Sequence, residues 1–428
     1  MEKREFTTDL AVIGSGLAGM AASIFALKRN IPTALAGNTG AIAYTTGYLD
    51  LLGYNGENPA ELLSDPWLGI RQLQATEPGH PLARIPENDI RDAFSEFTAF
   101  LGECGIAYGP PGTANITAIT PAGTTKPTLC VPATMQAGVD ALAAKARCVI
   151  VDFQGLRGFS ARQVVANLEG SWPGLSAQRI SFPDMPKGEI YREVMARALE
   201  VPATREKVAA AILEIRGEAE AVGIPAIMGM HAPDLVMAEL SRLIGCPIFE
   251  IPTMPPSVPG IRLREMFEQV FPQKGLTLVP QQKVQSLDFS SDGLQLSLAD
   301  NFGPILIRAR AVILATGRFL SGGLKAERDG IVEPLLRLPV SQPATREEWY
   351  GMSYLGRDHG IHKCGIEIDD RCRPLNNAGQ VVDHRLFAAG AILAHQNWIR
   401  SRSGAGIAIA SAFKAVTAAQ QVIEQLKP

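Results

Sequence analysis

The sequence predicts an α/β protein in which an inserted domain interrupts a nucleotide-binding fold, and three observations lead to this class. A β-branched strand, a glycine-rich turn and an alanine-rich helix open the chain at residues 7–30. Two further strands that end in glycine are predicted nearer the C-terminus, at residues 311–318 and 386–390. Between these parts, from Tyr108 onward, the chain changes to short β-prone pieces broken by Gly and Pro, which indicates an insertion.

The opening turn carries the clearest functional signal. Residues 7–13 lead into G-S-G-L-A-G, and a helix without proline follows. In such a motif the first glycine permits the tight turn, the second lets a phosphate approach the backbone, and the third lets the helix pack close to the strand. The sequence therefore predicts that the free amides of this helix N-terminus hold the phosphate of a cofactor, with Gly14, Ser15, Gly16, Leu17, Ala18 and Gly19 as the binding residues.

One feature of a dinucleotide site is missing. About 20 residues after the glycines, such folds usually carry an acid that binds the ribose hydroxyls of the adenosine. Here the second strand, residues 33–36, is followed by Gly37, Asn38, Thr39 and Gly40. Asn38 can hydrogen-bond a ribose, but the simpler interpretation is that the adenosine half is weakly held or absent. The sequence therefore favours FMN, with FAD as the alternative.

Length, charge and hydrophobicity limit the number of domains, the kinds of partner and the location that the chain can have. A chain of 428 residues exceeds one ordinary core, so at least two domains are expected. The net charge of -3 gives no reason to expect nucleic acid or an anionic membrane surface as a partner. No run reaches the roughly 18 uncharged apolar residues that a transmembrane helix needs. The first residues, MEKREF, lead directly into a core strand, so we expect no signal peptide and a cytoplasmic location.

The six cysteines are not clustered. None lies in a C-x-x-C motif, so the spacing of iron–sulfur clusters and zinc sites is absent, and we expect buried thiols and no metal site. If electrons leave this chain for a membrane carrier, a partner is expected to supply the iron–sulfur relay.

A stretch of Gly, Thr and Tyr without helical periodicity follows the second strand, at residues 40–56. Thr45, Thr46 and Gly47 suit the close approach of a flat ring and hydrogen bonds to its edge, and they are predicted to contact the flavin. The alternative is an ordinary surface loop.

We expect the flavin-binding domain at residues 1–108 and 275–428, with an inserted α+β cap or substrate domain at residues 109–274. A buried strand is predicted at residues 148–153. Helices are predicted at residues 89–103, 160–168, 189–199, 204–218 and 234–244, and in the second half of residues 247–271. Short strands from residue 276 to residue 307 are expected to form a β-meander that ends in A-V-I-L-A-T-G-R.

The second half of the flavin-binding domain supplies further cofactor contacts. Strand ends place small residues beside the cofactor at Ala315, Thr316 and Gly317, and again at Gly390 and Ala391. Many flavoproteins carry an acid where Ala391 stands, so this is a second departure from the usual pattern. A long helix opens with Ser403, Gly404, Ala405 and Gly406, and its free amides are expected to face the pyrimidine end of a flavin.

Two histidines and four arginines are the candidates for binding and oxidising a substrate. His395 and His231 are the proposed bases, and Arg262, Arg264, Arg400 and Arg402 are the proposed phosphate ligands. His395, Arg400 and Arg402 are ranked by their position between a strand glycine and the last long helix. Structural hydrogen bonding by the histidines and ion pairing by the arginines are the alternatives.

Four segments together resemble one family, the small B-type subunit of anaerobic glycerol-3-phosphate dehydrogenase. They are D-L-A-V-I-G-S-G-L-A-G-M-A-A at the start, G-Y-L-D-L-L at residues 47–52, F-E-I-P-T-M-P-P-S-V-P-G-I-R-L at residues 249–263, and A-A-G-A-I-L-A-H with S-G-A-G-I-A near the end. The two middle segments are the specific ones, whereas flavoproteins widely share the first and last.

The resemblance implies an FMN-associated protein that joins two partners at the cytoplasmic membrane face, a catalytic, FAD-bearing subunit of the same complex and its iron–sulfur subunit. The complex would oxidise sn-glycerol 3-phosphate to dihydroxyacetone phosphate and pass the electrons to quinone, serving fumarate or nitrate respiration. Two alternatives stay open. One is an electron-transfer or assembly subunit without substrate chemistry, and the other is a stand-alone FAD enzyme of the fumarate reductase or ketosteroid dehydrogenase type.

Overall fold

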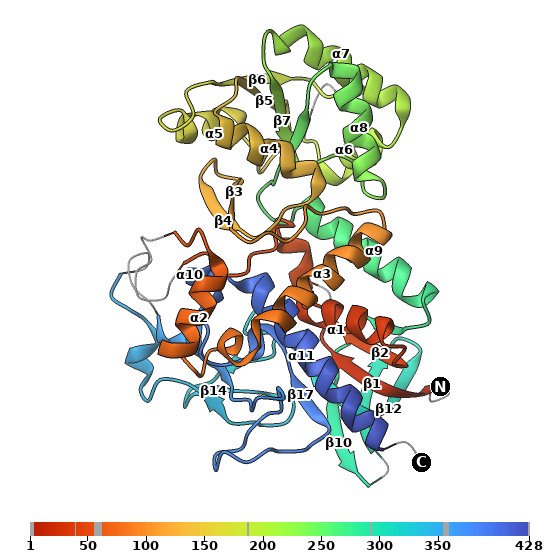
Figure 1. The fold of residues 1–428 in the computed structure, drawn as a ribbon. Helices are drawn as coiled ribbons and strands as arrows, with labels where there is room; N and C mark the ends of the chain where they lie inside the picture. Colours follow the sequence, from red (N-terminus) through yellow and green to blue (C-terminus); the bar gives the residue numbers. More distant parts are fainter. Residues whose placement is uncertain are drawn as a thin grey trace. The chain divides into compact units, whose positions relative to one another are not determined.

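The chain forms two compact units in the computed structural model, which describes residues 4–38, 40–54, 62–185, 188–291, 293–353 and 359–426 (Figure 1). The first unit comprises Met1–Ile42, Asp50–Phe97 and Phe267–Pro428, and the second comprises Ala43–Leu49 and Thr98–Met266. The second unit is thus inserted into the first. The predicted domain edges after residues 108 and 274 lie somewhat later than this division and stay a prediction.

A seven-stranded sheet forms the centre of the first unit, in the order β10-β11-β12-β1-β2-β9 with β17 also beside β12. Its members are β1 (Arg4–Ile13), β2 (Thr33–Gly37), β9 (Thr277–Pro280), β10 (Ser286–Ser290), β11 (Gly293–Asp300), β12 (Gly303–Leu314) and β17 (Leu386–Ala388). Strands β9, β2, β1, β12 and β17 run parallel, and β10 and β11 extend the sheet as an antiparallel hairpin. The second half of β1 and the whole of β2 are almost entirely buried, as expected for a parallel sheet covered on both faces.

The structure corrects one part of the predicted meander. Residues 277–280 pair in parallel with β2 at the far side of the sheet, so only β10, β11 and β12 form a meander. The run at 305–307 and the run from Ala311 belong to one long strand, β12. Local β-propensity identified the strands, but their partners depend on distant segments.

Two apolar helices pack together in the first unit, α1 (Leu17–Lys28) and α11 (Gly404–Gln425). Phe25 of α1 meets Phe413 of α11 edge-on with ring centroids 5.2 Å apart. Helix α11 is long and apolar enough to cross a membrane, but 72% of its most apolar window is buried inside the structure. That burial is typical of a core helix, and the membrane signal is weak.

The first unit has further elements besides this sheet and these two helices. They are η1 (Gly40–Tyr44), α2 (Pro66–Thr76), η2 (Pro81–Arg84), α3 (Glu87–Glu103), β13 (Lys325–Ala326), β14 (Ile331–Val332), β15 (Val340–Ser341), η3 (Arg346–Trp349), η4 (Gly360–Lys363), β16 (Gly365–Ile366), η5 (Gly390–Ile392) and α10 (Trp398–Ser401), of which η1 and α3 extend into the second unit.

The second unit has its own parallel sheet, in the order β6-β5-β7-β8. Its elements are β3 (Ile116–Ile119), β4 (Thr125–Thr128), α4 (Ala133–Ala144), β5 (Cys148–Phe153), α5 (Ala161–Leu168), β6 (Leu175–Ile180), α6 (Arg192–Leu199), α7 (Pro202–Arg216), β7 (Ala221–Pro225), α8 (Pro233–Ile244), β8 (Ile248–Ile251) and α9 (Val258–Gln273), the last continuing into the first unit. Helices and parallel strands alternate, so the insertion is α/β and not the α+β domain that the sequence analysis expected.

Alternate residues of β5 belong to two different cores. Val149, Val151 and Phe153 pack with α6, α7 and α8, whereas Cys148 and Ile150 pack with α5 and Trp172. A strand covered on both faces needs a continuous apolar run, and C-V-I-V-D-F supplies it. The predicted strand at 148–153 is confirmed, and the predicted helices α3, α5, α6, α7, α8 and α9 are confirmed to within a few residues.

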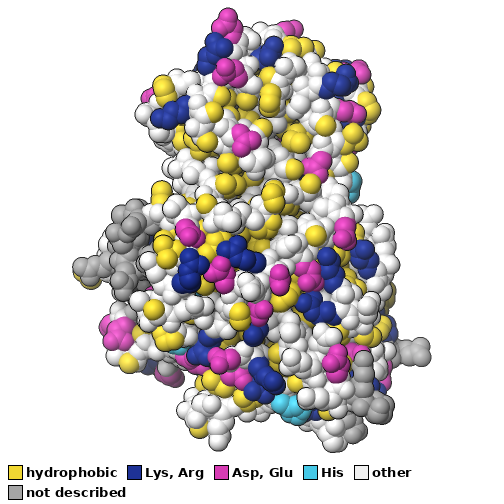
Figure 2. Space-filling model, viewed as in Figure 1, with side chains coloured by type: hydrophobic (Ala, Val, Ile, Leu, Met, Phe, Trp, Pro, Cys, Tyr) yellow, Lys and Arg dark blue, Asp and Glu magenta, His cyan; other side chains and the backbone are white. Residues whose placement is uncertain are grey.

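The sequence analysis missed α2, α4 and β6. Strand β6, L-S-A-Q-R-I, has no buried residue because it lies at the edge of its sheet, so it lacks the continuous apolar run of a central strand. Charged side chains of both signs are interspersed over the face that Figure 2 shows, in keeping with the small net charge.

The buried His80 makes stability depend on pH. Its side chain is 3% exposed, and Nδ1 accepts a hydrogen bond from the Leu82 amide at 3.2 Å. Burial, with smaller effects of Lys363 and His395, lowers the pKa of His80 from 6.5 to about 3. Between pH 6.5 and 3 the unfolded state therefore binds a proton that the folded state excludes, so the free energy of unfolding falls as the pH falls, by up to about 1.4 kcal/mol per pH unit.

We predict that H80N, whose amide oxygen can still accept from Leu82, flattens this slope below pH 6.5. Urea unfolding at a series of pH values measures the slope, and H384N is the matched control because the His384 side chain is 60% exposed. Equal slopes for H80N and the wild type would contradict the assignment.

Candidate functional site

The parallel strands of the first unit all end at one edge of the sheet. Ile13 of β1 pairs with Ala36 of β2 on one side and with Leu314 of β12 on the other. Leu314 in turn pairs with Ala388 of β17. The residues that follow these strands therefore meet at this edge, where α/β sheets bind ligands, and we call it the sheet edge site.

The glycine turn after β1 is too tightly packed for side chains. Gly14 has φ +110°, and a Cβ there would lie 2.3 Å from the carbonyl oxygen of Ala315. A Cβ on Gly19 would lie 1.7 Å from the carbonyl oxygen of Gly14. The turn thus needs glycine at both positions to bring α1 against the end of β1.

The same turn leaves hydrogen-bonding groups open at the helix N-terminus. Among the described residues, the amides of Ser15, Gly16, Leu17 and Ala18 have no backbone acceptor. The buried Ser15 hydroxyl has no hydrogen-bond partner within the described residues, and a Cβ on Gly16 would meet none of their atoms within 4 Å. These observations fit a bound phosphate, because an anion would satisfy the donors that the turn exposes.

The ends of β12 and β17 line the same edge. The Thr316 hydroxyl is a second buried group that has no hydrogen-bond partner in the described part of the chain, and Gly317 follows it. Gly390 lies between α1 and α11, since its Cβ would come within 2.5 Å of the Ala18 Cβ and 4.0 Å of the Ala408 Cα. Ala391 comes next, and in the described part of the chain its carbonyl accepts a hydrogen bond from the Gln396 amide at 3.2 Å.

The N-terminus of α11 is only partly open. The Gly406 amide donates to the Asp50 carbonyl at 2.6 Å, so this predicted cofactor contact is already occupied. Within the described ranges, the amides of Gly404 and Ala405 have no backbone acceptor, and they remain available to a ligand. The Ser403 hydroxyl lies 3.0 Å from the Ser401 hydroxyl.

The predicted ring contacts Thr45, Thr46 and Gly47 belong to the second unit. Gly47, with φ +86°, packs there against Pro259 and Pro132, and its carbonyl accepts a hydrogen bond from Tyr108 at 2.8 Å. Their role as flavin contacts stays a prediction. Residues 55 and 56 of the same predicted loop lie outside the described residues.

His395 is held by the segment that carries Lys363 and Glu367 in the first unit. Its backbone has φ +59°, and its amide donates to the Lys363 carbonyl at 2.9 Å. Its Nε2 makes a hydrogen bond to the Glu367 carboxylate, and the two side chains are 40% and 37% exposed. The two predicted phosphate ligands that follow, Arg400 and Arg402, flank the end of α10, where Arg400 is half-buried and Arg402 is exposed.

The sequence analysis missed Arg318, which directly follows the A-T-G at the end of β12. Its guanidinium donates to the carbonyls of His362, Leu393 and Gln396, and among the described residues it has no carboxylate partner. Burial lowers its pKa to about 10, so it stays charged at neutral pH. The available signal was its position after a strand end at the sheet edge site.

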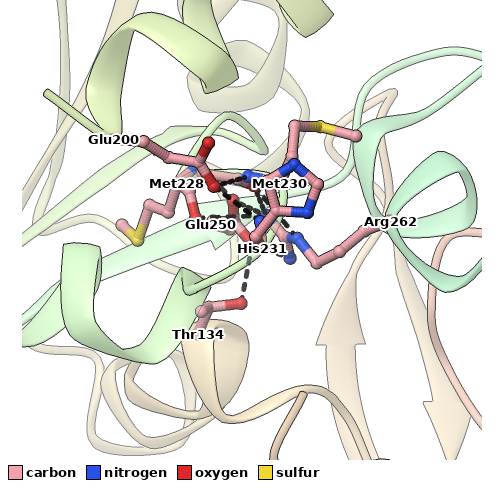
Figure 3. A network of polar contacts seen from close by, with 8 residues as sticks. Thr134, Glu200, Met228, Met230, His231, Glu250 and Arg262 are labelled. Atoms are coloured by element: carbon pink, nitrogen blue, oxygen red, sulfur yellow. Dashed lines mark hydrogen bonds and ion pairs between the residues drawn. The ribbon is translucent and has the colours of Figure 1, made fainter. Parts of the chain in front are cut away.

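Arg262 is a correction to the predicted phosphate ligands. It lies in the second unit, is 1% exposed, and forms an ion pair with Glu250 at 3.1 Å (Figure 3). It also donates to the Gly229 carbonyl at 2.8 Å, while Glu250 accepts from the Met228 amide and the Thr134 hydroxyl, each at 2.6 Å. Since its donors are already satisfied internally, Arg262 stabilises this unit and is not placed to bind substrate.

His231, a predicted base, and Arg264, a predicted phosphate ligand, also lie in the second unit, and their roles stay predictions. His231 is exposed, and its amide donates to the Glu200 carboxylate at 2.6 Å (Figure 3). Arg264 is half-buried, with an Nε that has no partner among the described residues. The structure assigns both to a different unit from the sheet edge site.

Comparison with known proteins gives the family. The FAD binding domain family matches residues 9–407. The B-type subunit of anaerobic glycerol-3-phosphate dehydrogenase from Aliivibrio fischeri is 30% identical, with 98% of this chain and 96% of that protein covered. The chain belongs to this family of anaerobic glycerol-3-phosphate dehydrogenase subunits.

The family is matched over essentially its full length, since the Yersinia pestis member is 28% identical with 98% of both chains covered. A 3-ketosteroid delta1-dehydrogenase from Sterolibacterium denitrificans is a structural neighbour at 10% identity, covering 98% of this chain and all of that one. Its TM-score of 0.43 is too low to carry an argument. Membership of the FAD binding domain family indicates a flavin cofactor. The open donors of the sheet edge site fit the phosphate of such a cofactor.

Substitutions of Gly16 and Gly19 in the turn should separate flavin binding from stability. G16A leaves packing intact because its Cβ enters open space, so we expect normal thermal stability with flavin affinity at least about tenfold lower. G19A puts a Cβ 1.7 Å from the Gly14 oxygen, so we expect both stability and flavin content to fall.

Calorimetry of the variants and flavin titration measure the two effects. G102A is the matched control, because Gly102 is another helical glycine whose Cβ would meet nothing within 4 Å. Tight flavin binding by G16A would show that the phosphate does not approach this position.

For the Arg262–Glu250 pair, we predict that R262M lowers the free energy of unfolding by about 3–5 kcal/mol, because it leaves a buried carboxylate unpaired. The double variant R262M/E250Q removes that charge and should recover part of the loss. Urea unfolding of the single and double variants measures these changes in the free energy of unfolding. R197M is the control, because Arg197 pairs with Glu265 at the surface. There the loss of the ion pair should lower the free energy of unfolding by about 1 kcal/mol or less. Full stability of R262M would return Arg262 to the phosphate candidates.

Proposed function

We propose that this chain is the B-type flavoprotein subunit of an anaerobic glycerol-3-phosphate dehydrogenase, which oxidises sn-glycerol 3-phosphate to dihydroxyacetone phosphate. The observation that carries the proposal is the full-length match to that family together with a sheet edge site whose open amides and partnerless hydroxyls fit a flavin. A flavin in this site supplies the acceptor for the hydride of a secondary alcohol.

The chain's own residues then bind and orient the cofactor. The amides at the start of α1, with the Ser15 hydroxyl, would hold a phosphate, and the Gly404 and Ala405 amides would favour negative charge near the start of α11. His395 is the proposed base for the hydroxyl proton. Arg400, Arg402 and Arg264 remain the proposed ligands of the substrate phosphate. Arg318, which has no carboxylate partner in the described ranges, adds a positive charge after the end of β12.

The form of the flavin is part of the proposal. The family match supports FAD, whereas the missing acid after β2 led the sequence analysis to FMN. In the structure β2 ends at Gly37, whose carbonyl accepts from the Gln281 amide at 3.0 Å, and Asn38 follows. We take FAD as the first candidate and FMN as the alternative.

Partners follow from the family name, which describes one subunit of a larger enzyme. We propose that this chain assembles with a catalytic FAD-bearing subunit of the same complex plus its iron–sulfur subunit, on the cytoplasmic membrane face, and that the complex delivers electrons to quinone. A second function also requires a test, that of an electron-transfer or assembly subunit without substrate chemistry. The burial of Arg262 favours it, because it removes one of four predicted phosphate ligands.

The test is to purify the full chain, alone and with the subunits that co-purify, release the flavin by heat, and identify it by chromatography. We expect FAD, and we expect glycerol 3-phosphate to bleach it in the complex. Dithionite reduction is the control for a reducible flavin. Bleaching of the isolated chain would make it a dehydrogenase by itself, and bleaching only through a partner's flavin would favour electron transfer. The absence of any flavin would overturn the proposal.

A further inference from the structure

His395 and Glu367 form a pair that resembles an oriented base, and it is built from segments far apart in the chain. His395 follows η5, while Glu367 follows β16. The Ala394 amide donates to the Ile366 carbonyl at 3.1 Å and the His395 amide donates to the Lys363 carbonyl at 2.9 Å, so backbone bonds fix the two segments side by side. The backbone therefore holds the two side chains near each other.

A third segment fits beneath the imidazole ring. A Cβ on Gly79 would lie 3.2 Å from the His395 Cδ2 and 3.3 Å from its Cγ, so any larger residue there would press on the ring. The positive φ of His395 is a second constraint, since left-handed backbone costs a residue with a side chain free energy. Orientation of this ring is thus determined by backbone, by Gly79 and by Glu367.

The hydrogen bond to Glu367 determines which ring nitrogen is open. A neutral imidazole that donates its Nε2 proton to a carboxylate keeps the lone pair on Nδ1. Among the described residues, Nδ1 of His395 has no hydrogen-bond partner. The ring is 40% exposed, so a ligand can reach it. A base with one nitrogen held by an acid and the other open is the arrangement that acid–base catalysis uses.

The pair lies next to the sheet edge site within the same unit. Arg318, four residues beyond the end of β12, donates to the carbonyls of Leu393 and Gln396 on either side of His395. Gln396 also donates to the Ala391 carbonyl directly after Gly390. The segment that carries His395 is thereby tied to two of the strand ends that form the flavin site.

We propose that Glu367 is a positioning residue that orients His395 as the base for the substrate hydroxyl. The inference rests on the proposed function. In the reaction the hydroxyl proton would pass to Nδ1 of His395 and the C–O single bond would become the carbonyl of the product. A bound flavin would supply the acceptor for the hydrogen of the alcohol carbon with its bonding electron pair. Glu367 stabilises the imidazolium that results.

The charged neighbours of this pair are few in the described part of the chain. Lys363 lies on the segment of Glu367 and is 3.7 Å from Glu77, and His80 follows Gly79. His80 is neutral near pH 7 because burial lowers its pKa to about 3. The carboxylate of Glu367 is therefore the group in contact with His395 that can hold a positive charge on the ring.

The experiment uses the flavin-loaded full chain with its co-purifying subunits. Stopped-flow bleaching by glycerol 3-phosphate should slow at least about 100-fold in H395N and about tenfold in E367Q, in the rate and not in the apparent substrate affinity. In the H395N background E367Q should have no further effect, because Glu367 acts through the ring. E367D, which keeps a carboxylate, should recover part of the rate, and H384N is the matched histidine control.

A second readout does not require turnover. Histidine-selective ¹⁵N NMR, with H395N to assign the signal, should show the Nε2-protonated form of His395 in the wild type and a loss of that preference in E367Q. Equal slowing by E367Q in both backgrounds, or a wild-type rate in E367Q, would overturn the proposal. If dithionite reduces the flavin but glycerol 3-phosphate does not, the proposed function fails and the base assignment with it, while the NMR result still reports whether the pair exists.

Discussion

The fold of the first unit depends on a backbone contact that leaves no space for side chains. Gly14 approaches Ala315, and Gly19 approaches Gly14, at distances that a Cβ would violate. Because of this contact α1 starts at the carboxyl end of the central strand, and α11 can pack against α1 with Gly390 between them. The ends of β1, β2, β12 and β17 and the N-terminus of α1 then lie at one edge of the sheet. Tight packing thus places the open amides of α1 at the edge where α/β sheets bind ligands.

The two units differ in how completely their buried polar groups are hydrogen-bonded. In the second unit Arg262 and Glu250 are almost fully buried and satisfy each other together with backbone groups and Thr134. Such a network stabilises one packing arrangement and leaves little for a ligand to bind. At the sheet edge site, by contrast, the buried hydroxyls of Ser15 and Thr316 have no hydrogen-bond partner among the residues that the structure describes. Unsatisfied donors beside a strand end indicate a ligand, because folding alone does not compensate for their burial.

In the proposed mechanism, the segment between Gly390 and α11 would connect cofactor binding to proton transfer. Arg318 and Gln396 hold its backbone, while Glu367 and Gly79 hold the ring of His395. Arg318, Glu367 and Gly79 come from three other parts of the chain, whereas Gln396 lies within the segment itself. The base is therefore oriented by the same packing that forms the flavin site, and a change in one is expected to affect the other.

Local sequence determined the elements that depend on near neighbours. The run of β-branched residues, the glycine spacing and the alanine-rich helix at residues 7–30 were sufficient to predict β1, the turn and α1, since each contact in them is made within a few residues. The apolar run at 148–153 likewise predicted β5. The tertiary structure alone decided that residues 277–280 pair with β2, that the inserted unit has a parallel sheet, and that Arg262 is buried against Glu250. It also brought Glu367 to His395, because such pairings depend on which distant segments share a core, and periodicity along the chain does not encode that choice.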